Sequence, residues 1–329
     1  MGELLSLAGD NILSPPIMFF ALGFAAALLR SDLSIPEAIS KAVALYLMFA
    51  IGFKGGASLS SGGLEVLALW AALLGIGLSF VIPLISFAIL KAITGLSQVD
   101  AAAVSAHYGS VSVVTFVTAA NFLGIENIPY EVWIIAVLAL METPAIVTGL
   151  ALARRGAPGA ERKSLFSGDV MREVLLNGSI VMLLGAFAIG WATGEKGLAD
   201  VAPFVVDPFK GVLCLFLLDM GLTAARQLHK AEGLGPSSIA FGLFMPLIGA
   251  TLGLFGAWAI GMSLGGATLM AVLGGSASYI AVPAALRMAL PQANAAIYLT
   301  LSLGVTFPFN VLIGIPIYLA AAEMLYGVI

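Results

Sequence analysis

Charged residues, cysteine and histidine are all scarce in this chain. Only 10% of its 329 residues are charged and 60% are hydrophobic, whereas a soluble domain carries about 25% charged residues. The single cysteine, Cys214, excludes an internal disulfide and a cysteine-based metal cluster. Neither histidine, His107 or His229, lies in an HExxH-type pattern, and the serine-rich segments lack the Gly-x-Ser-x-Gly elbow, which argues against an enzyme. The net charge of -4, without a basic stripe, gives no reason to expect nucleic-acid binding.

Long apolar runs fill most of the sequence, and the mean hydropathy is +1.08. A helix needs about 17 to 25 predominantly apolar residues to cross a bilayer. Ten such runs lie between charged or Gly/Pro breaks, at about 14–30, 35–53, 64–90, 98–122, 131–153, 172–192, 206–226, 236–262, 266–288 and 292–321. The sequence therefore predicts an all-α, multi-pass protein of the cell (inner or plasma) membrane with ten transmembrane helices.

Basic residues gather in or beside every second link between these runs. The links after odd-numbered spans hold Arg30, Lys91, Arg154, Arg155, Arg162, Lys163, Arg172, Arg226, Lys230 and Arg287. Lys54 and Lys196 lie near the links after even-numbered spans, where Lys54 either snorkels or steers anions. Because cytoplasmic loops carry an excess of Lys and Arg, the links after odd-numbered spans are predicted to be cytoplasmic. With ten spans, both termini then lie outside.

The longest of the predicted cytoplasmic links, residues 154–171, divides the chain into 1–153 and 172–329 with five spans each. An odd number of spans per half turns the second half upside down relative to the first. Segments 100–120 and 266–286 align without a gap and superpose one Gly-Ser-x-Ser stretch on another. We therefore predict an inverted 5+5 repeat with a cytoplasmic linker at 154–171.

Each Gly-Ser-x-Ser stretch lies in the middle of a predicted span. Non-helical backbone at that depth is tolerated only where it is buried in protein or lines a wet cavity, so both spans are predicted to break and to cross near the midplane. Half-helix N-termini and hydroxyls then offer hydrogen-bond donors to a small oxyanion, although for either stretch alone helix packing is the alternative. The predicted anion site comprises Gly109, Ser110, Val111, Ser112, Gly275, Ser276, Ala277 and Ser278.

A coupling cation needs oxygen ligands, and intramembrane carboxylates are costly enough to be read as functional. Glu142 lies beside Thr143 and Pro144 in the fifth span, where the proline frees carbonyls of the preceding turn. Asn310 has the roughly equivalent place in the other half. Glu142, Thr143 and Asn310 are therefore predicted cation ligands.

Three further polar residues each have two possible roles. Asp219 in the seventh span either holds an interhelical hydrogen bond or binds an ion. Tyr279 either contacts the substrate or packs as a wedge, and His107 is either a structural donor or a proton relay. The sequence alone leaves these roles open.

Four stretches carry a likeness to a known family. They read SIPEAISKAVALYLMFAIGFKGG, YEVW, METPAIVTG and AVPAALRMALPQANAAIYLTLSLGVTFPFN. Together they resemble the SbtA family of sodium-dependent bicarbonate transporters over essentially the whole chain. The resemblance implies an inverted 5+5 fold divided into core and gate domains, with bicarbonate taken up with sodium and no other cofactor. It also implies a homotrimer and a small PII-like cytoplasmic regulator.

The family motifs match this chain unevenly. Cyanobacterial members read G-A-V-S-G-S-T where residues 109–115 read GSVSVVT, so the resemblance carries Ser112 and Thr115 into the site, Thr115 as a cation ligand. Their second motif reads S-S-S-D, and Tyr279 stands in place of the aspartate. The link at 154–171 is much shorter than the corresponding segment, which leaves the regulator open.

The sequence thus favours a secondary transporter that carries bicarbonate inward with sodium by alternating access. A symporter of another small anion or carboxylate stays open, as does coupling to protons through Glu142. An anion channel could use the same donors without coupling, but two broken spans and five-plus-five symmetry favour the transporter.

Overall fold

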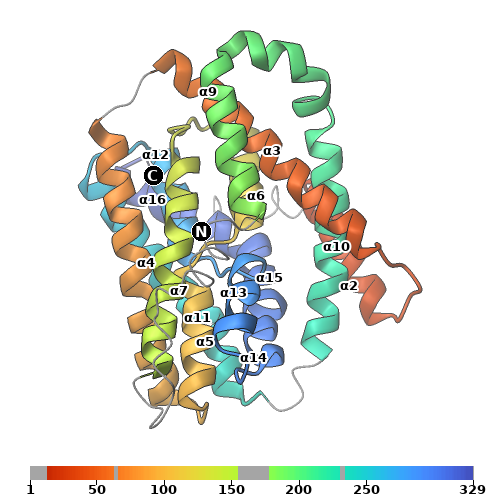
Figure 1. Cartoon of the computed structure of the whole chain (residues 1–329), viewed down its shortest axis with the longest axis vertical. Helices are drawn as coiled ribbons and strands as arrows, with labels where there is room; N and C mark the ends of the chain where they lie inside the picture. The colour runs from red at the N-terminus through yellow and green to blue at the C-terminus, as the bar shows by residue number, and fades with distance from the viewer. Residues whose placement is uncertain (1–12, 63–65, 155–177, 230–233, 329) are drawn as a thin grey trace.

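The computed structural model describes residues 13–62, 66–154, 178–229 and 234–328, and all regular structure in these ranges is helical (Figure 1). In the first half the helices are α2 (Pro15–Leu28), α3 (Glu37–Gly62), α4 (Val66–Ile93), α5 (Gln98–Gly109), α6 (Val113–Ile125) and α7 (Ile134–Arg154). In the second half they are α9 (Gly178–Val205), α10 (Phe209–His229), α11 (Pro236–Ala259), α12 (Leu264–Gly275), α13 (Ala281–Ala289), α14 (Ala295–Leu299), α15 (Phe307–Phe309) and α16 (Ile315–Tyr326), with π-helical segments η1 (Thr300–Thr306) and η2 (Asn310–Gly314).

Seven helical stretches within the described ranges are long and apolar enough to cross a membrane. They include α5 with α6 counted as one stretch and the run from α14 to α16 as another, and α2 and α12 are shorter apolar helices. The all-helical, multi-pass prediction is therefore confirmed. Each of the ten predicted spans overlaps described helix, but the number of crossings and the inverted repeat stay predictions, and nearly all of the predicted linker 154–171 lies outside the described residues.

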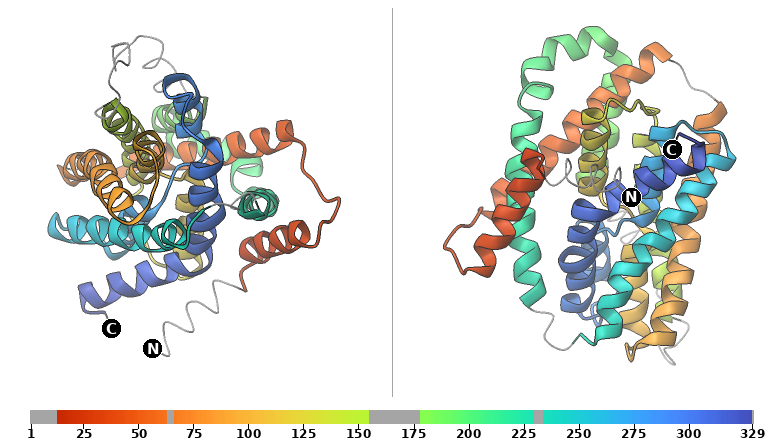
Figure 2. Two further views of the ribbon diagram at one scale, coloured as in Figure 1. Left: turned by 90° about the horizontal axis from the view of Figure 1, so that it is seen from below. Right: turned by 180° about the vertical axis from the view of Figure 1, so that it is seen from behind.

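Four helices, α2, α3, α9 and α10, form one group at the side of the molecule (Figure 2). Within this group α3 packs chiefly on α9, and α10 packs on α2. Glycines permit these close crossings: a Cβ at Gly23 would overlap the Leu218 carbonyl, and one at Gly221 would overlap that of Phe20. Small residues at crossings are typical of helices that associate in lipid, where close van der Waals packing replaces the hydrophobic effect. We call these four helices the side group.

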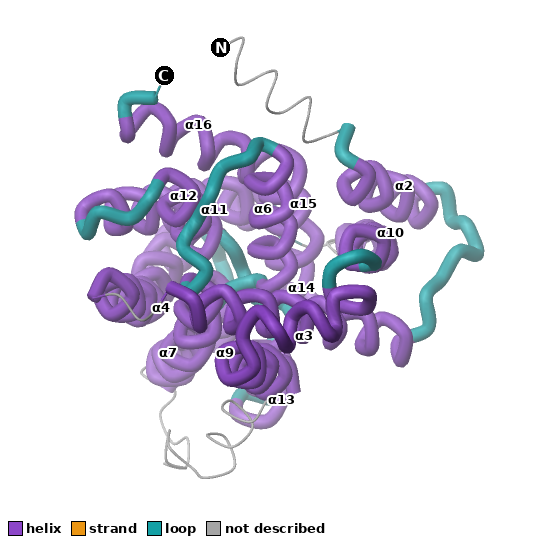
Figure 3. The backbone as a smooth tube through the Cα atoms, turned by 90° about the horizontal axis from the view of Figure 1, so that it is seen from above, coloured by secondary structure: helices purple, strands orange, loops and turns teal. Residues whose placement is uncertain are grey.

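The remaining helices, α4 to α7 and α11 to α16, form the central group (Figure 3). Here α4 packs on α5 and α7, and α11 packs on α12. Gly109 lies against Pro83 of α4, and Gly275 lies against the Pro246 carbonyl of α11. The two Gly-Ser segments are thus each held against a proline-containing long helix.

The outer faces of α4 and α11 carry large apolar side chains such as Trp70, Phe80, Phe244 and Phe255, all exposed. In a water-soluble protein so much exposed apolar surface would promote association. On membrane-spanning helices it is the surface that lipid covers. The polar residues Ser110, Glu142 and Asn310 are instead buried inside the central group.

Candidate functional site

Two helices of the central group break at the predicted Gly-Ser segments. Helix α5 ends at Gly109 and α6 begins at Val113, while α12 ends at Gly275 and α13 begins at Ala281. The serine after each glycine has nearly the same extended backbone, with φ −93° and ψ 163° at Ser110 and φ −92° and ψ 167° at Ser276. Both spans are therefore interrupted where the sequence predicts.

The two breaks are bonded to each other through backbone amides. The Ser112 N–H donates to Ser276 Oγ at 3.0 Å, and the Ser278 N–H donates to the His107 carbonyl at 2.8 Å. Ser276 Oγ also donates to the Leu273 carbonyl at 3.1 Å. The hydrogen bonds that hold the crossing together thus involve three residues of the predicted anion site, Ser112, Ser276 and Ser278. Fewer backbone amides are therefore left to bind a ligand.

Other polar groups at the breaks are not used in this way. Ser110 Oγ is fully buried and has no hydrogen-bond partner among the described residues. Ser112 Oγ accepts the Thr115 N–H at 3.2 Å and so caps the first turn of α6. Helix α13 begins at Ala281, and its N-cap residue, Ile280, provides no side-chain cap. Because the first N–H groups of a helix lack intrahelical partners, both α6 and α13 present positive helix ends at the breaks.

A cavity of about 10 Å³, the space of roughly one water molecule, lies beside the crossing. It is lined by Met48, Val111, Ser112, Val113, Glu142, Ser278, Tyr279 and Ile280. Glu142 reaches it from α7, is only 3% exposed, and its Oε2 has no hydrogen-bond partner among the described residues. A buried, unpartnered carboxylate is costly unless a cation or a proton compensates its charge. We call this space the inner cavity.

The other predicted cation ligands lie around this point but not all together. Thr115 is buried in the first turn of α6, and Thr143 is partly exposed next to Glu142; neither lines the inner cavity. Asn310 is engaged elsewhere: its Nδ2 donates to the Gly275 carbonyl at 2.9 Å, and its Oδ1 accepts from Tyr318 at 2.6 Å. The structure therefore brings Glu142 to Ser112 and Ser278 but gives Asn310 protein partners.

Two of the residues whose roles the sequence leaves open, Asp219 and His107, have structural contacts. Asp219 accepts a hydrogen bond from Ser40 of α3, so it joins α3 to α10 within the side group, away from the breaks. The His107 Nδ1 lies 2.7 Å from the Ala103 carbonyl, and its ring stacks on Tyr298. These contacts match the structural reading of both residues.

Tyr279 has two neighbours that correspond to its two readings. Its ring meets the edge of Phe307 at 5.2 Å between centroids. Its hydroxyl faces Ser112 but forms no hydrogen bond of ordinary geometry with a described residue. The ring therefore has a packing role, and Tyr279 is also one of the residues that line the inner cavity.

Sequence reasoning missed four residues at this site. Three of them, Met48, Val113 and Ile280, line the inner cavity, and Met48 of α3 is the one lining residue that the side group supplies. Ser79 of α4 donates a hydrogen bond to the Met141 carbonyl, directly before Glu142. Ser79 carries a weak signal, one of two hydroxyls in an apolar span, whereas nothing in the sequence distinguishes Met48 from other apolar residues.

The chain matches the family model of the Na+-dependent bicarbonate transporter superfamily over residues 15–323. It belongs to this superfamily. A search of the curated proteins finds no match. Membership makes the chain a transporter and not an enzyme, and confirms the resemblance found in its motifs; the family name supports bicarbonate as substrate and sodium as coupling ion. In this transporter superfamily member the crossing and its buried carboxylate form the candidate transport site.

Proposed function

We propose that this protein is a secondary active transporter that carries bicarbonate into the cell together with sodium by alternating access. The observation that carries the proposal is the meeting of two broken helices beside the buried, unpartnered Glu142. A carboxylate there supplies the negative charge that a cation needs, while the N-terminal ends of α6 and α13 supply positive potential for an anion. Each ion compensates the other, which is a physical basis for coupling their movement.

The inner cavity can hold the proposed sodium ion without any change in its shape. Its volume accommodates a single small cation, and the Glu142 carboxylate with the Ser112 and Ser278 hydroxyls offers the oxygen ligands that sodium prefers. Bicarbonate, with four non-hydrogen atoms, needs more room. Movement of the lining elements is therefore required before the anion enters.

We propose that this movement separates a gate domain, the side group, from a core domain, the central group. Met48 of α3 closes the inner cavity from the side group, and the seven other lining residues belong to the central group. A shift of α3 relative to the breaks would enlarge the cavity without cutting the hydrogen bonds of Ser112 to Ser276 and of Ser278 to His107.

Matching local geometry supports the proposed inverted 5+5 repeat of ten crossings. Helices α5 and α12 both have 12 residues. Each begins after a serine cap, Ser97 accepting from the Asp100 N–H and Ser263 from the Gly266 N–H. Their residue numbers differ by 166 at both ends (263 − 97 and 275 − 109), so the aligned stretches have equal length.

Two carboxylates also join the halves in a related way. Asp100, at the start of α5, accepts from the Asn294 N–H at 2.8 Å, just before α14. Glu131, just before α7, accepts from the Ser263 N–H at 2.7 Å, at the start of α12. In both cases the start of a broken helix is bonded to the start of the last span of the other half, as a twofold relation between inverted halves requires.

In the proposed orientation both termini lie outside, and the protein resides in the cell membrane. The ends of α3 and α6 and the starts of α7 and α10 then face outward. The resemblance to the SbtA family further suggests a homotrimer and a PII-like regulator on the cytoplasmic side. The linker where such a regulator would be sought, 154–171, lies almost wholly outside the described residues.

The test is uptake of radiolabelled bicarbonate into proteoliposomes that hold the purified protein. An inward sodium gradient is compared with an equal potassium gradient, a proton gradient alone, and no gradient. Accumulation above the gradient-free level with sodium only is the expected result. Equal, gradient-independent equilibration would indicate a channel, and no uptake at all would reject bicarbonate as substrate.

A second candidate is a proton-coupled symporter of a small anion or carboxylate. It is favoured by Tyr279, which stands where the family carries a carboxylate, and by the unpartnered Glu142, which can carry a proton as well as face a cation. Accumulation with the proton gradient alone would support this candidate. Competition by acetate or formate would then identify the anion class.

A further inference from the structure

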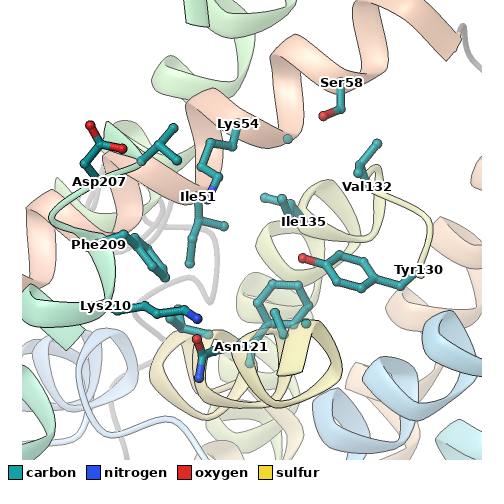
Figure 4. A pocket seen from close by; sticks show the side chains of 16 residues that line it. Ile51, Lys54, Ser58, Asn121, Tyr130, Val132, Ile135, Asp207, Phe209 and Lys210 are labelled. Carbon is teal, nitrogen blue, oxygen red and sulfur yellow. The ribbon is translucent and has the colours of Figure 1, made fainter. Parts of the chain in front are cut away.

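A second cavity, much larger than the inner cavity, opens between the side group and the central group (Figure 4). Its volume is about 500 Å³. Polar or charged side chains from both groups line it, namely Lys54, Ser58, Asn121, Tyr130, Asp207 and Lys210. We call this space the vestibule.

The vestibule carries two lysines without carboxylate partners. Lys54 of α3 is half-buried, and its Nζ lies 4.9 Å from the centroid of the Phe209 ring. Lys210 follows Phe209 at the start of α10, is exposed, and lines the same cavity. Neither forms an ion pair within the described part of the chain, although Asp207 also borders the cavity; Lys41, by contrast, is paired with Glu37. Two uncompensated cations at one cavity favour an anion between them.

Neutral donors complete the lining on the central-group side. In Figure 4 the Tyr130 hydroxyl points toward the middle of the cavity, and Lys210 extends toward Asn121. Burial raises the pKa of the Tyr130 phenol above its ordinary value, so its hydroxyl remains a hydrogen-bond donor. An oxyanion in the vestibule would therefore meet ammonium, amide and phenol donors.

The vestibule lies directly next to the inner cavity. On α3, Met48 lines the inner cavity and Ile51 lines the vestibule; on α6, Val113 lines the inner cavity and Phe116 lines the vestibule. Each pair is three residues apart, which is about 4.5 Å along a helix. A layer of apolar side chains less than one helical turn thick thus separates the two spaces.

We propose that the vestibule is an anion-binding site in which Lys54 and Lys210 hold a small oxyanion, bicarbonate in the first place, before it passes to the crossing. That this is the entry side rests on the proposed function; the binding itself does not. Lysine is suited to transient binding, because its ammonium is a strongly hydrated point charge without a bidentate fork. The two charges raise the local anion concentration and so the rate of capture.

The first experiment measures binding without transport. Protein in detergent is acetylated with a negatively charged amine-reactive reagent at fixed pH, and the extent at each lysine is followed by mass spectrometry. Potassium bicarbonate is compared with potassium gluconate at the same ionic strength. We expect bicarbonate to slow acetylation of Lys54 and Lys210 at least about twofold, as an occupied, screened site requires, while Lys41 is unchanged. Equal rates in both salts at both vestibule lysines would overturn the proposal.

The second experiment measures transport by Lys54→Gln and Lys210→Gln. At low ionic strength we expect the KM for bicarbonate to rise by about three- to tenfold with the maximal rate preserved, and the difference to shrink at high salt. Lys210→Arg keeps the charge and should keep the KM. Lys41→Gln, on the same helix as Lys54 but away from the vestibule, is the matched control.

The two experiments separate the failure of each proposal. If the wild-type protein transports no bicarbonate, the proposed function fails, and the acetylation experiment still tests the vestibule. If wild-type uptake is normal and both glutamine variants retain its KM at low salt, the vestibule proposal fails alone.

Discussion

The two breaks share a starting geometry but differ in how their polar groups are satisfied. The first break has three residues between α5 and α6, and the unpartnered carboxylate of Glu142 lies beside it. The second has five residues between α12 and α13, and its neighbour Asn310 is hydrogen-bonded to both Gly275 and Tyr318. The first break thus has an ionisable group without a partner beside it, whereas the amide of Asn310 beside the second break is hydrogen-bonded within the protein.

This difference indicates different roles for Glu142 and Asn310. A buried polar network that is fully satisfied rigidifies the structure, whereas a buried charge without a partner calls for a ligand. We therefore expect Glu142 in the first half to supply the charge for the coupling cation, and Asn310 in the second half to support the crossing. Substitutions of these two residues should then change different measurements, transport for Glu142 and stability for Asn310.

The largest effect is expected from Glu142→Gln, which removes the charge while keeping the side-chain volume. Sodium-driven uptake should fall at least about tenfold, equivalent to about 1.4 kcal/mol, because the cation loses its charged ligand. Thermal stability should be unchanged or higher, since a buried charge no longer has to be compensated. Uptake and thermal unfolding are measured on the same preparation.

The control for Glu142→Gln is Glu195→Gln, the same change at an exposed position on α9. It should leave uptake and stability at wild-type values. Retention of full sodium dependence by Glu142→Gln would place the cation elsewhere. If a proton gradient drives uptake by the wild-type protein but not by the variant, Glu142 binds a proton instead of sodium.

On the other side, Asn310→Ala should reduce stability rather than coupling. It leaves the Gly275 carbonyl and the Tyr318 hydroxyl without their partner, at a cost of about 2 kcal/mol or more. Tyr318→Phe removes only one of these bonds and should cost about 1 kcal/mol. Thermal unfolding in detergent measures both, and the sodium concentration for half-maximal uptake should not move. A raised sodium requirement in Asn310→Ala would contradict the comparison and make Asn310 itself a cation ligand.

A smaller contrast lies within the second break, between two serines that are two residues apart. Ser276→Ala removes the acceptor of the Ser112 N–H and should cost about 1 to 2 kcal/mol in stability. Ser278→Ala keeps its backbone bond to His107 and removes a hydroxyl from the inner cavity. We expect it to raise the KM for bicarbonate or sodium severalfold with stability within about 0.5 kcal/mol. If both variants behave alike, the serines do not divide into a structural and a binding residue.

Much of the fold could be predicted because it depends on local sequence. Apolar runs predict helices, and Gly-Ser in the middle of a span predicts a break; both follow from the need to satisfy backbone groups in lipid. The extent of α9 could not be predicted. The predicted span ends at 192, before the charged Glu195 and Lys196, but helix resumes after a kink at Gly194 and reaches Val205. The π-helical segments η1 and η2 were also missed, because hydrophobicity does not report the hydrogen-bond register.

The candidate site could be predicted only in its chemistry-bearing residues. Glu142 is costly in a membrane and so has a signal in a single sequence. Met48 has none, because an apolar residue gains its place by the packing of α3 against the crossing. The hydrogen bonds of the Ser112 amide to Ser276 and of the Ser278 amide to His107 could not be predicted for a related reason. An alignment of the halves does not show which donors are already hydrogen-bonded within the protein. The roles in transport stay predictions until they are measured.

The smallest effect is expected from Tyr279→Phe, which tests what replaced the family carboxylate. The ring contact with Phe307 is retained, and the hydroxyl that is lost forms no hydrogen bond of ordinary geometry. Stability should therefore stay within about 0.5 kcal/mol of wild type, and the KM for bicarbonate within about twofold, since no buried partner is left unpaired. The measurement is uptake over a range of bicarbonate and sodium concentrations. A tenfold rise in the bicarbonate KM would make the hydroxyl a substrate ligand, and the second break would then contribute a binding group beside Ser278.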